Sequence, residues 1–94
     1  MMDVMKDAIS YEAKQCGFTS MEYEPAKKRA ILDYMKSFDP FAVAGMVYDC
    51  RTGVKLRTEN VGYNDGKFMW SEQDIYHIDK YNASVTEEFL KAIT

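Results

Sequence analysis

The only histidine of the chain, His77, is the first residue whose side chain could do chemistry. Asp74 stands three residues before it and Tyr81 four residues after it, so a helix would place all three on one face. A carboxylate beside an imidazole can orient a general base. The sequence puts no nucleophile beside this group and offers no second base. We therefore interpret His77 as a structural helix residue and expect no catalytic residues.

The two cysteines, Cys16 and Cys50, are too few for the disulfide framework of a small secreted domain. Arg51 follows Cys50, and a neighbouring cation favours the reactive thiolate, but one cation does not make a catalytic site. Neither cysteine belongs to a Cys-x-x-Cys pair or a histidine-rich cluster, which zinc sites use. The five glycines are scattered and form no phosphate-binding loop. We predict no metal site and no cofactor.

The only basic run is Lys27-Lys28-Arg29, and Lys55 and Arg57 follow on a later segment. A nucleic-acid surface would need more charge and stacking aromatic side chains on the same face. We interpret the run as a solvated helix face, so nucleic acid is not the expected partner. Weak nucleic-acid binding through Lys27-Lys28-Arg29 stays open as an alternative.

Acidic and aromatic residues concentrate in the last third of the chain. Residues 58–94 hold seven Asp/Glu and three Lys/Arg, whereas residues 1–57 hold eight and nine. Tyrosine and tryptophan are common anchors of protein interfaces, and exposed ones among these acids would suit a cationic partner. The candidate partner-binding residues are Tyr63, Asp65, Trp70, Glu72, Asp74, Tyr76, His77 and Asp79.

The elements that must position these side chains begin with two predicted helices. Apolar residues recur at three- and four-residue spacing over 3–16, and Gly17 can end that helix in a left-handed conformation. A second apolar stripe covers 22–38. Pro25 fits its first turn, and Asp39-Pro40 ends it because the residue before proline avoids the helical region.

The pattern changes to strands after Pro40. Residues 41–48 are nearly all apolar, 49–53 form a turn, and 54–57 alternate apolar and basic residues as a half-exposed strand does. Residues 58–62 are irregular, with a bulge or an extension of that strand as the alternatives. A second tight turn at Asn64-Asp65-Gly66 precedes a strand over 67–70. The prediction is a three-stranded antiparallel meander.

Two short helices complete the chain. Ser71 is a typical N-cap with an acid, Asp74, three residues later, and Asn82 can take the left-handed conformation at the helix end. A final helix follows over 86–93. The expected order is therefore ααβββαα, which is an α+β fold with two N-terminal and two short C-terminal helices around the meander.

The 94 residues suit a single domain spanning 1–94, with 47% hydrophobic residues and a net charge of −3. No apolar run is long enough to span a membrane and the first residues do not resemble a signal peptide, so we expect a cytoplasmic location and no membrane partner. A chain this short builds a thin core. A partner or a second copy of the chain would then cover the open sheet face.

These observations favour a small acidic protein-interaction module without catalytic activity. An inhibitor or adaptor that binds a basic protein surface is the concrete form, and a homo-oligomer is the other way to use such a surface. The main alternative is a small-ligand binder or enzyme with a pocket built from His77, Asp74 and a tyrosine. Weak nucleic-acid binding is the further alternative.

Overall fold

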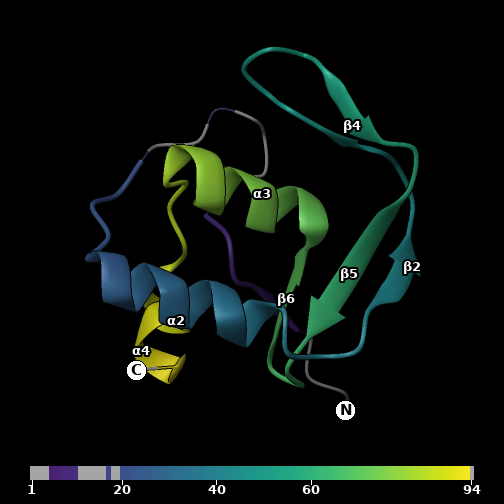
Figure 1. The fold of residues 1–94 in the computed structure, drawn as a ribbon. Coiled ribbons are helices and arrows are strands. Elements are labelled where there is room, and N and C mark those ends of the chain that lie inside the picture. Colours follow the sequence, from purple (N-terminus) through teal and green to yellow (C-terminus); the bar gives the residue numbers. More distant parts are fainter. Residues whose placement is uncertain (1–4, 11–16, 18–19, 94) are drawn as a thin grey trace.

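The computed structural model describes residues 5–10, 17 and 20–93, and in this part it combines three helices with two small sheets (Figure 1). A mixed helix-and-sheet fold is therefore confirmed. The larger sheet has the strand order β1-β6-β5-β2 and the smaller one pairs β3 with β4. The strands are β1 (Lys6–Asp7), β2 (Phe41–Val43), β3 (Val47–Tyr48), β4 (Lys55–Arg57), β5 (Asn60–Asn64) and β6 (Phe68–Ser71).

The helices of the described part are α2 (Pro25–Met35), α3 (Glu72–Tyr81) and α4 (Glu87–Ile93). Both predicted caps of α3 are present. The backbone N–H of Ser71 donates to the Asp74 carboxylate at 2.9 Å, and the Ser71 hydroxyl accepts from the backbone N–H of Asp74. Asn82 ends the helix in the left-handed conformation at φ 56°. Local sequence signals were sufficient here because each cap depends on residues close in the chain.

The helix predicted over 3–16 is wrong where the structure describes it, and residues 11–16 lie outside the described part. Lys6–Asp7 form β1, which pairs in parallel with β6. The backbone N–H of Lys6 donates to the backbone carbonyl of Lys67, and that of Ala8 donates to the carbonyl of Met69, each at an N···O distance of 3.0 Å. Strand pairing with β6 thus satisfies the backbone hydrogen bonds that a helix would otherwise have made. The apolar spacing of the sequence could not reveal this, because it carries no information about a distant strand.

The three-stranded meander is also wrong. The apolar segment 41–48 divides into β2 and β3 at Gly45, whose φ is 102°. After β2 the chain leaves the larger sheet, forms the separate β3–β4 hairpin and returns as β5, which pairs with both β2 and β6. Residues expected to be irregular thus supply most of β5, a central strand. Its sequence, Asn-Val-Gly-Tyr-Asn, has too little apolar alternation to signal a strand.

The core lies between the β1–β6 side of the larger sheet and the helices. In Figure 1 the helices gather beside β6, whereas β2 and β4 lie at the far side of the sheet. The rings of Phe68 and Phe89 pack edge to face, with 5.3 Å between the ring centres. The Trp70 indole N–H donates to the backbone carbonyl of Met35 at 2.9 Å, which fixes α2 against β6. The helices therefore lie on the β1–β6 side of the larger sheet, and β2 forms its opposite edge.

Candidate functional site

Helix α3 has two buried faces. Ile75 and Ile78 face the hydrophobic core. On its other side, residues 73, 76, 77 and 81 follow the spacing of one helical face. They bind residues 48–50 of the segment 48–53, which comprises the end of β3 and the turn of the β3–β4 hairpin. We call this junction of α3 and the hairpin the hub.

The centre of the hub is the carboxylate of Asp49, which is only 2% exposed. One of its oxygens, Oδ2, accepts hydrogen bonds from the hydroxyls of Tyr76 at 2.7 Å and Tyr81 at 2.6 Å. The other, Oδ1, accepts from the backbone N–H groups of Arg51 and Thr52 at 2.8 and 3.0 Å. All four bonds join the hairpin turn to itself or to α3.

These bonds keep Asp49 charged. Burial by itself would raise the pKa of Asp49, but the hydrogen bonds from Tyr81, Tyr76 and the two backbone groups outweigh it, and the pKa lies well below its usual range. Lys80 adds a cation 4.0 Å from Oδ2. The guanidinium of Arg51 lies 4.6 Å from the centre of the Tyr81 ring. The hub thus holds a buried anion through donors that are already in place.

His77 has no basic lone pair directed to solvent. Its ring is only 5% exposed. The backbone N–H of Cys50 can only donate, so Nε2 of His77 accepts this bond at 2.9 Å and carries no proton. Nδ1 then holds the proton and donates to the backbone carbonyl of Gln73 at 2.8 Å. This neutral ring bridges α3 and the hairpin, and Asp74, the expected partner of His77, instead closes the cap of α3.

Cys50 is disulfide-bonded, so its sulfur is not a thiol nucleophile. The other cysteine of the chain, Cys16, lies outside the described residues. Disulfides are more typical of oxidising compartments. No described helix is long and apolar enough to cross a membrane. The cytoplasmic location therefore stays a prediction.

Within the described part, none of the aromatic members of the candidate partner-binding set is fully exposed: Trp70 and His77 are buried, and Tyr63 and Tyr76 are half-buried. Trp70 is buried, and Tyr63 packs against the core beside it in the β5–β6 register. Tyr76 and His77 belong to the hub. The structure thus brings together two pairs of predicted residues, but neither pair forms an open surface.

The acids of that set are mostly occupied by local structure. Asp65 accepts from the Tyr34 hydroxyl at 2.6 Å and from the backbone N–H of Phe68 at 2.7 Å. Glu72 pairs with Arg57 at 2.8 Å. Asp79 is exposed. Three further acids in residues 58–93 also have partners. Asp74 is in the cap of α3, Glu88 pairs with Lys6 at 2.6 Å, and Glu87 pairs with Lys91 at 3.2 Å. Five of the seven acids in this range are therefore bonded to another group of the molecule.

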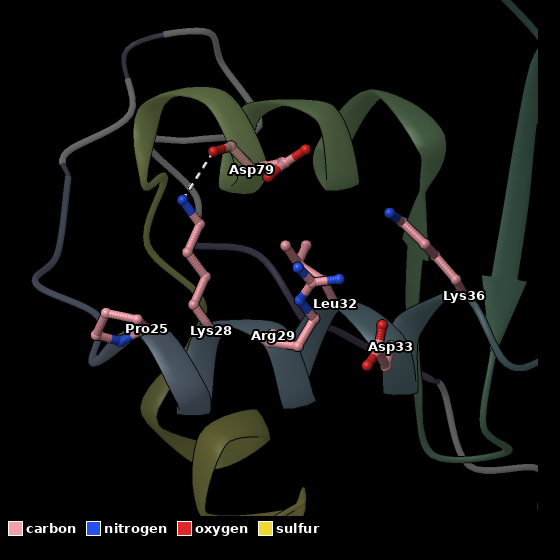
Figure 2. Close-up of a pocket in the computed structure, with 7 residues that line it drawn as sticks. All are labelled: Pro25, Lys28, Arg29, Leu32, Asp33, Lys36 and Asp79. Carbon is pink, nitrogen blue, oxygen red and sulfur yellow. Dashed lines mark hydrogen bonds between the residues drawn. The ribbon is translucent and has the colours of Figure 1, made fainter.

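The predicted basic run divides between two surfaces. Lys28 and Arg29 line a groove between α2 and α3 (Figure 2), whereas Lys27 borders a separate hollow beside α4. Arg57 and Lys55 lie on β4, which Figure 1 shows far from α2. The five cations therefore do not form one continuous surface.

Sequence reasoning missed the most exposed apolar surface. Six large hydrophobic side chains are exposed in the described part, and five of them lie between residues 41 and 57: Phe41, Met46, Tyr48, Val54 and Leu56. We call residues 41–57 the arm. The alternation at Val54-Lys55-Leu56-Arg57 indicated a strand with one apolar face in the core. Instead, Val54 is 56% and Leu56 42% exposed, because β4 pairs only with β3, outside the larger sheet.

The arm differs from the rest of the chain in charge. It contains Arg51, Lys55 and Arg57 and a single acid, Asp49, whereas the whole chain has a net charge of −3. Because Asp49 is buried, the exposed charged residues of the arm are all cations, although one of them, Arg57, pairs with Glu72 of α3. Comparison with known protein families, with curated proteins and with solved structures finds no match for the chain.

Proposed function

We propose that the protein is an interaction module that docks its arm onto a partner protein. The observation that supports this most directly is the concentration of five exposed large hydrophobic side chains between residues 41 and 57. Single exposed apolar residues are ordinary, but a group of them on one segment is typical of interaction sites. Burial of this group against a partner would remove apolar surface from water, which is the main driving force of association.

The hub supports the proposal because it fixes the hairpin turn of the arm to α3. Asp49 binds two tyrosines of α3, and the backbone N–H groups of Tyr48 and Cys50 donate to Gln73 and His77. Binding costs less free energy when a surface is already ordered before it meets the partner. The arm therefore combines exposed apolar side chains with a turn that is anchored on α3, which lowers the cost of ordering it on binding.

The exposed charges of the arm favour a partner whose binding site is apolar with acidic residues at its edge. Complementary charges select partners and accelerate association. The sequence had suggested a basic partner surface, but most acids of residues 58–93 are bound within the molecule. We propose an acidic partner in its place. Two copies of the arm facing one another would bring like charges together.

A pocket built on His77 receives less support. Both ring nitrogens bind backbone groups, and the ring is almost completely buried. A general base needs a lone pair within reach of a substrate proton. The arrangement at the hub instead joins a helix to a hairpin, which serves an interaction surface better than a reaction.

Photo-crosslinking in the source cell tests the proposal. The photoreactive amino acid benzoylphenylalanine is placed at Leu56 in the arm or, as a control, at Ala92 on the exposed side of α4. We expect one defined adduct with another protein from position 56 and none from position 92. That protein is then purified and its affinity for the chain is measured directly.

Substitutions in the arm complete the test. We expect Val54→Ser combined with Leu56→Ser to weaken binding of the purified partner by at least about tenfold, which corresponds to about 1.4 kcal/mol. Added salt should slow association because the charges act over a distance. Unchanged affinity of the double variant would overturn the proposal. An adduct between two copies of the chain would replace the partner with a homo-oligomer.

A further inference from the structure

The groove between α2 and α3 is a second surface, separate from the arm. Its volume is about 340 Å³, at the lower end of the range for small-molecule sites. The wall on the α2 side carries most of its charge, and Asp79 faces it from α3 (Figure 2). The lining residues are Pro25, Lys28, Arg29, Leu32, Asp33, Lys36 and Asp79.

Arg29 and Lys36 are the exposed cations of this groove. They are seven residues apart, or two helical turns, so they lie above one another on the same side of α2. Figure 2 shows both side chains directed toward α3. Neither has an ion pair or a side-chain hydrogen bond with another residue in the part of the chain that the structure describes. Two cations therefore face the same space, and within the described residues neither is held in an ion pair by Asp33 or Asp79, the two acids of the groove.

Lys28 closes one end of the groove. Its ammonium donates to the backbone carbonyl of Asp79 at 2.8 Å, which holds the charge beside the last turn of α3. An ammonium has three donors, so this bond leaves donors for a ligand. The groove thus has three cations and two acids, Asp33 and Asp79, and a net charge of +1.

We propose that this groove binds a small molecule through an oxyanion, a carboxylate or a phosphate group, held between Arg29 and Lys36. The planar guanidinium of arginine suits such groups because it donates two parallel hydrogen bonds to their oxygens. Lys28 supplies a third positive charge, and the side chain of Leu32 offers a short apolar surface for the carbon part of the ligand. The site uses no residue of the arm, so it does not depend on the interaction proposed above.

Titration of the full chain followed by NMR tests this proposal. The probes are inorganic phosphate and succinate, each added at constant ionic strength with sodium chloride as the balancing salt. We expect saturable shifts in the backbone amides of residues 28–36 and 76–81. Tighter binding of phosphate identifies a phosphate ligand, and tighter binding of succinate identifies a carboxylate ligand.

A pair of matched variants separates a site from general electrostatic attraction. Arg29→Gln with Lys36→Gln should reduce the affinity for the preferred probe at least tenfold. Lys27→Gln with Lys91→Gln removes the same charge outside the groove and should change the affinity less than about twofold. Asp79→Asn should strengthen binding because it removes a repelling charge.

Two results would overturn the proposal. One is the absence of saturable shifts with either probe. The other is an equal loss of affinity in both double variants, which would show that only the total charge matters. Since all four substituted cations have exposed or half-buried side chains, the spectra of the variants without probe should match the original and exclude misfolding as the cause.

Discussion

The hub contains the turn of the arm, and this turn differs from the strand β4 that follows it in how completely the side chains are buried and hydrogen-bonded. At the hub, Asp49 and His77 are almost fully buried, and every oxygen and ring nitrogen of these two side chains has a hydrogen-bond partner. In the arm beyond it, Val54 and Leu56 leave much of their apolar surface in water. Polar groups are thus inside and apolar groups outside, which is the reverse of the usual distribution.

This reversal shows that position in the fold decides the role of a residue more than its type does. A buried carboxylate is tolerated because four donors compensate its lost hydration. An exposed apolar side chain costs little in stability but gains free energy when a partner covers it. The hub therefore contributes to stability, and the arm remains available for binding.

The largest expected difference is between two truncations of hydrophobic side chains. Phe89→Ala in the core should lower the free energy of unfolding by about 3–5 kcal/mol, because it leaves a cavity among Phe68, Trp70 and Tyr34. Leu56→Ala in the arm should change it by less than about 0.5 kcal/mol. Denaturant unfolding measures both. Similar losses in the two variants would contradict the contrast, and Phe89→Leu is the substitute if the alanine variant does not fold.

A second comparison concerns two aspartates. Asp49→Asn keeps the shape of the side chain but removes the charge, and the amide nitrogen that replaces Oδ2 cannot accept the hydrogen bonds that the Tyr76 and Tyr81 hydroxyls donate. The melting temperature should fall by at least about 5 °C. The exposed Asp79→Asn is the matched control and should change it by no more than about 2 °C. If both variants melt alike, Asp49 is not the centre of the hub.

Acid should weaken the hub through the same carboxylate. The folded-state pKa values of Asp49 and Asp65 are lower than their ordinary value of 3.8. Both carboxylates stabilise the fold when the pH is above their ordinary pKa. This stabilisation is lost as the pH falls through that pKa toward the lower pKa of the folded state. The free energy of unfolding should therefore decrease between about pH 5 and pH 2. Asp49→Asn should flatten this decrease, and an unchanged slope would contradict the assignment.

The smallest expected effect is at the turn of the arm. Gly53 has a φ of 75°, and a Cβ atom built there would meet no other atom within 4 Å. Gly53→Ala should therefore cost only the backbone strain of the left-handed conformation, about 1 kcal/mol. Gly53→Asn should cost less because asparagine tolerates that conformation. A loss much above 2 kcal/mol by thermal unfolding would indicate that the turn is packed and not open.

Features that depend on residues close in the sequence were predicted well. Ser71, Asp74 and Asn82 define α3 through bonds that span three or four residues. Pro25 lies in the first turn of α2 as predicted because its fixed φ suits that position, but the helix covers Pro25–Met35 and is shorter at both ends than the predicted 22–38. The final helix is shifted by only one residue from its predicted start. Each of these signals acts within one turn, so no distant contact could change it.

Features that depend on pairing between distant segments were missed. β1 forms because its backbone finds β6 more than sixty residues away in the chain, as the pairing of Lys6 with Phe68 shows. Tyr76 was expected to be a surface aromatic because the carboxylate that it binds, Asp49, is 27 residues away in the chain. The bond from Tyr81 to the same carboxylate spans 32 residues and was not predicted either. The spacing of residues 73, 76, 77 and 81 was a signal of a second contact face on α3. The partner of that face, the β3–β4 hairpin, could be identified only from the tertiary structure.

The sequence by itself determined the helix caps, the turns and the mixed composition of the fold, because propensities and short-range hydrogen bonds act locally. The tertiary structure alone decided which chemistry is accessible. It enclosed His77 between Gln73 and Cys50, buried Asp49 among its donors and left Val54 and Leu56 in water. Burial is set by long-range packing, and a residue's exposure to a partner or ligand follows from that packing.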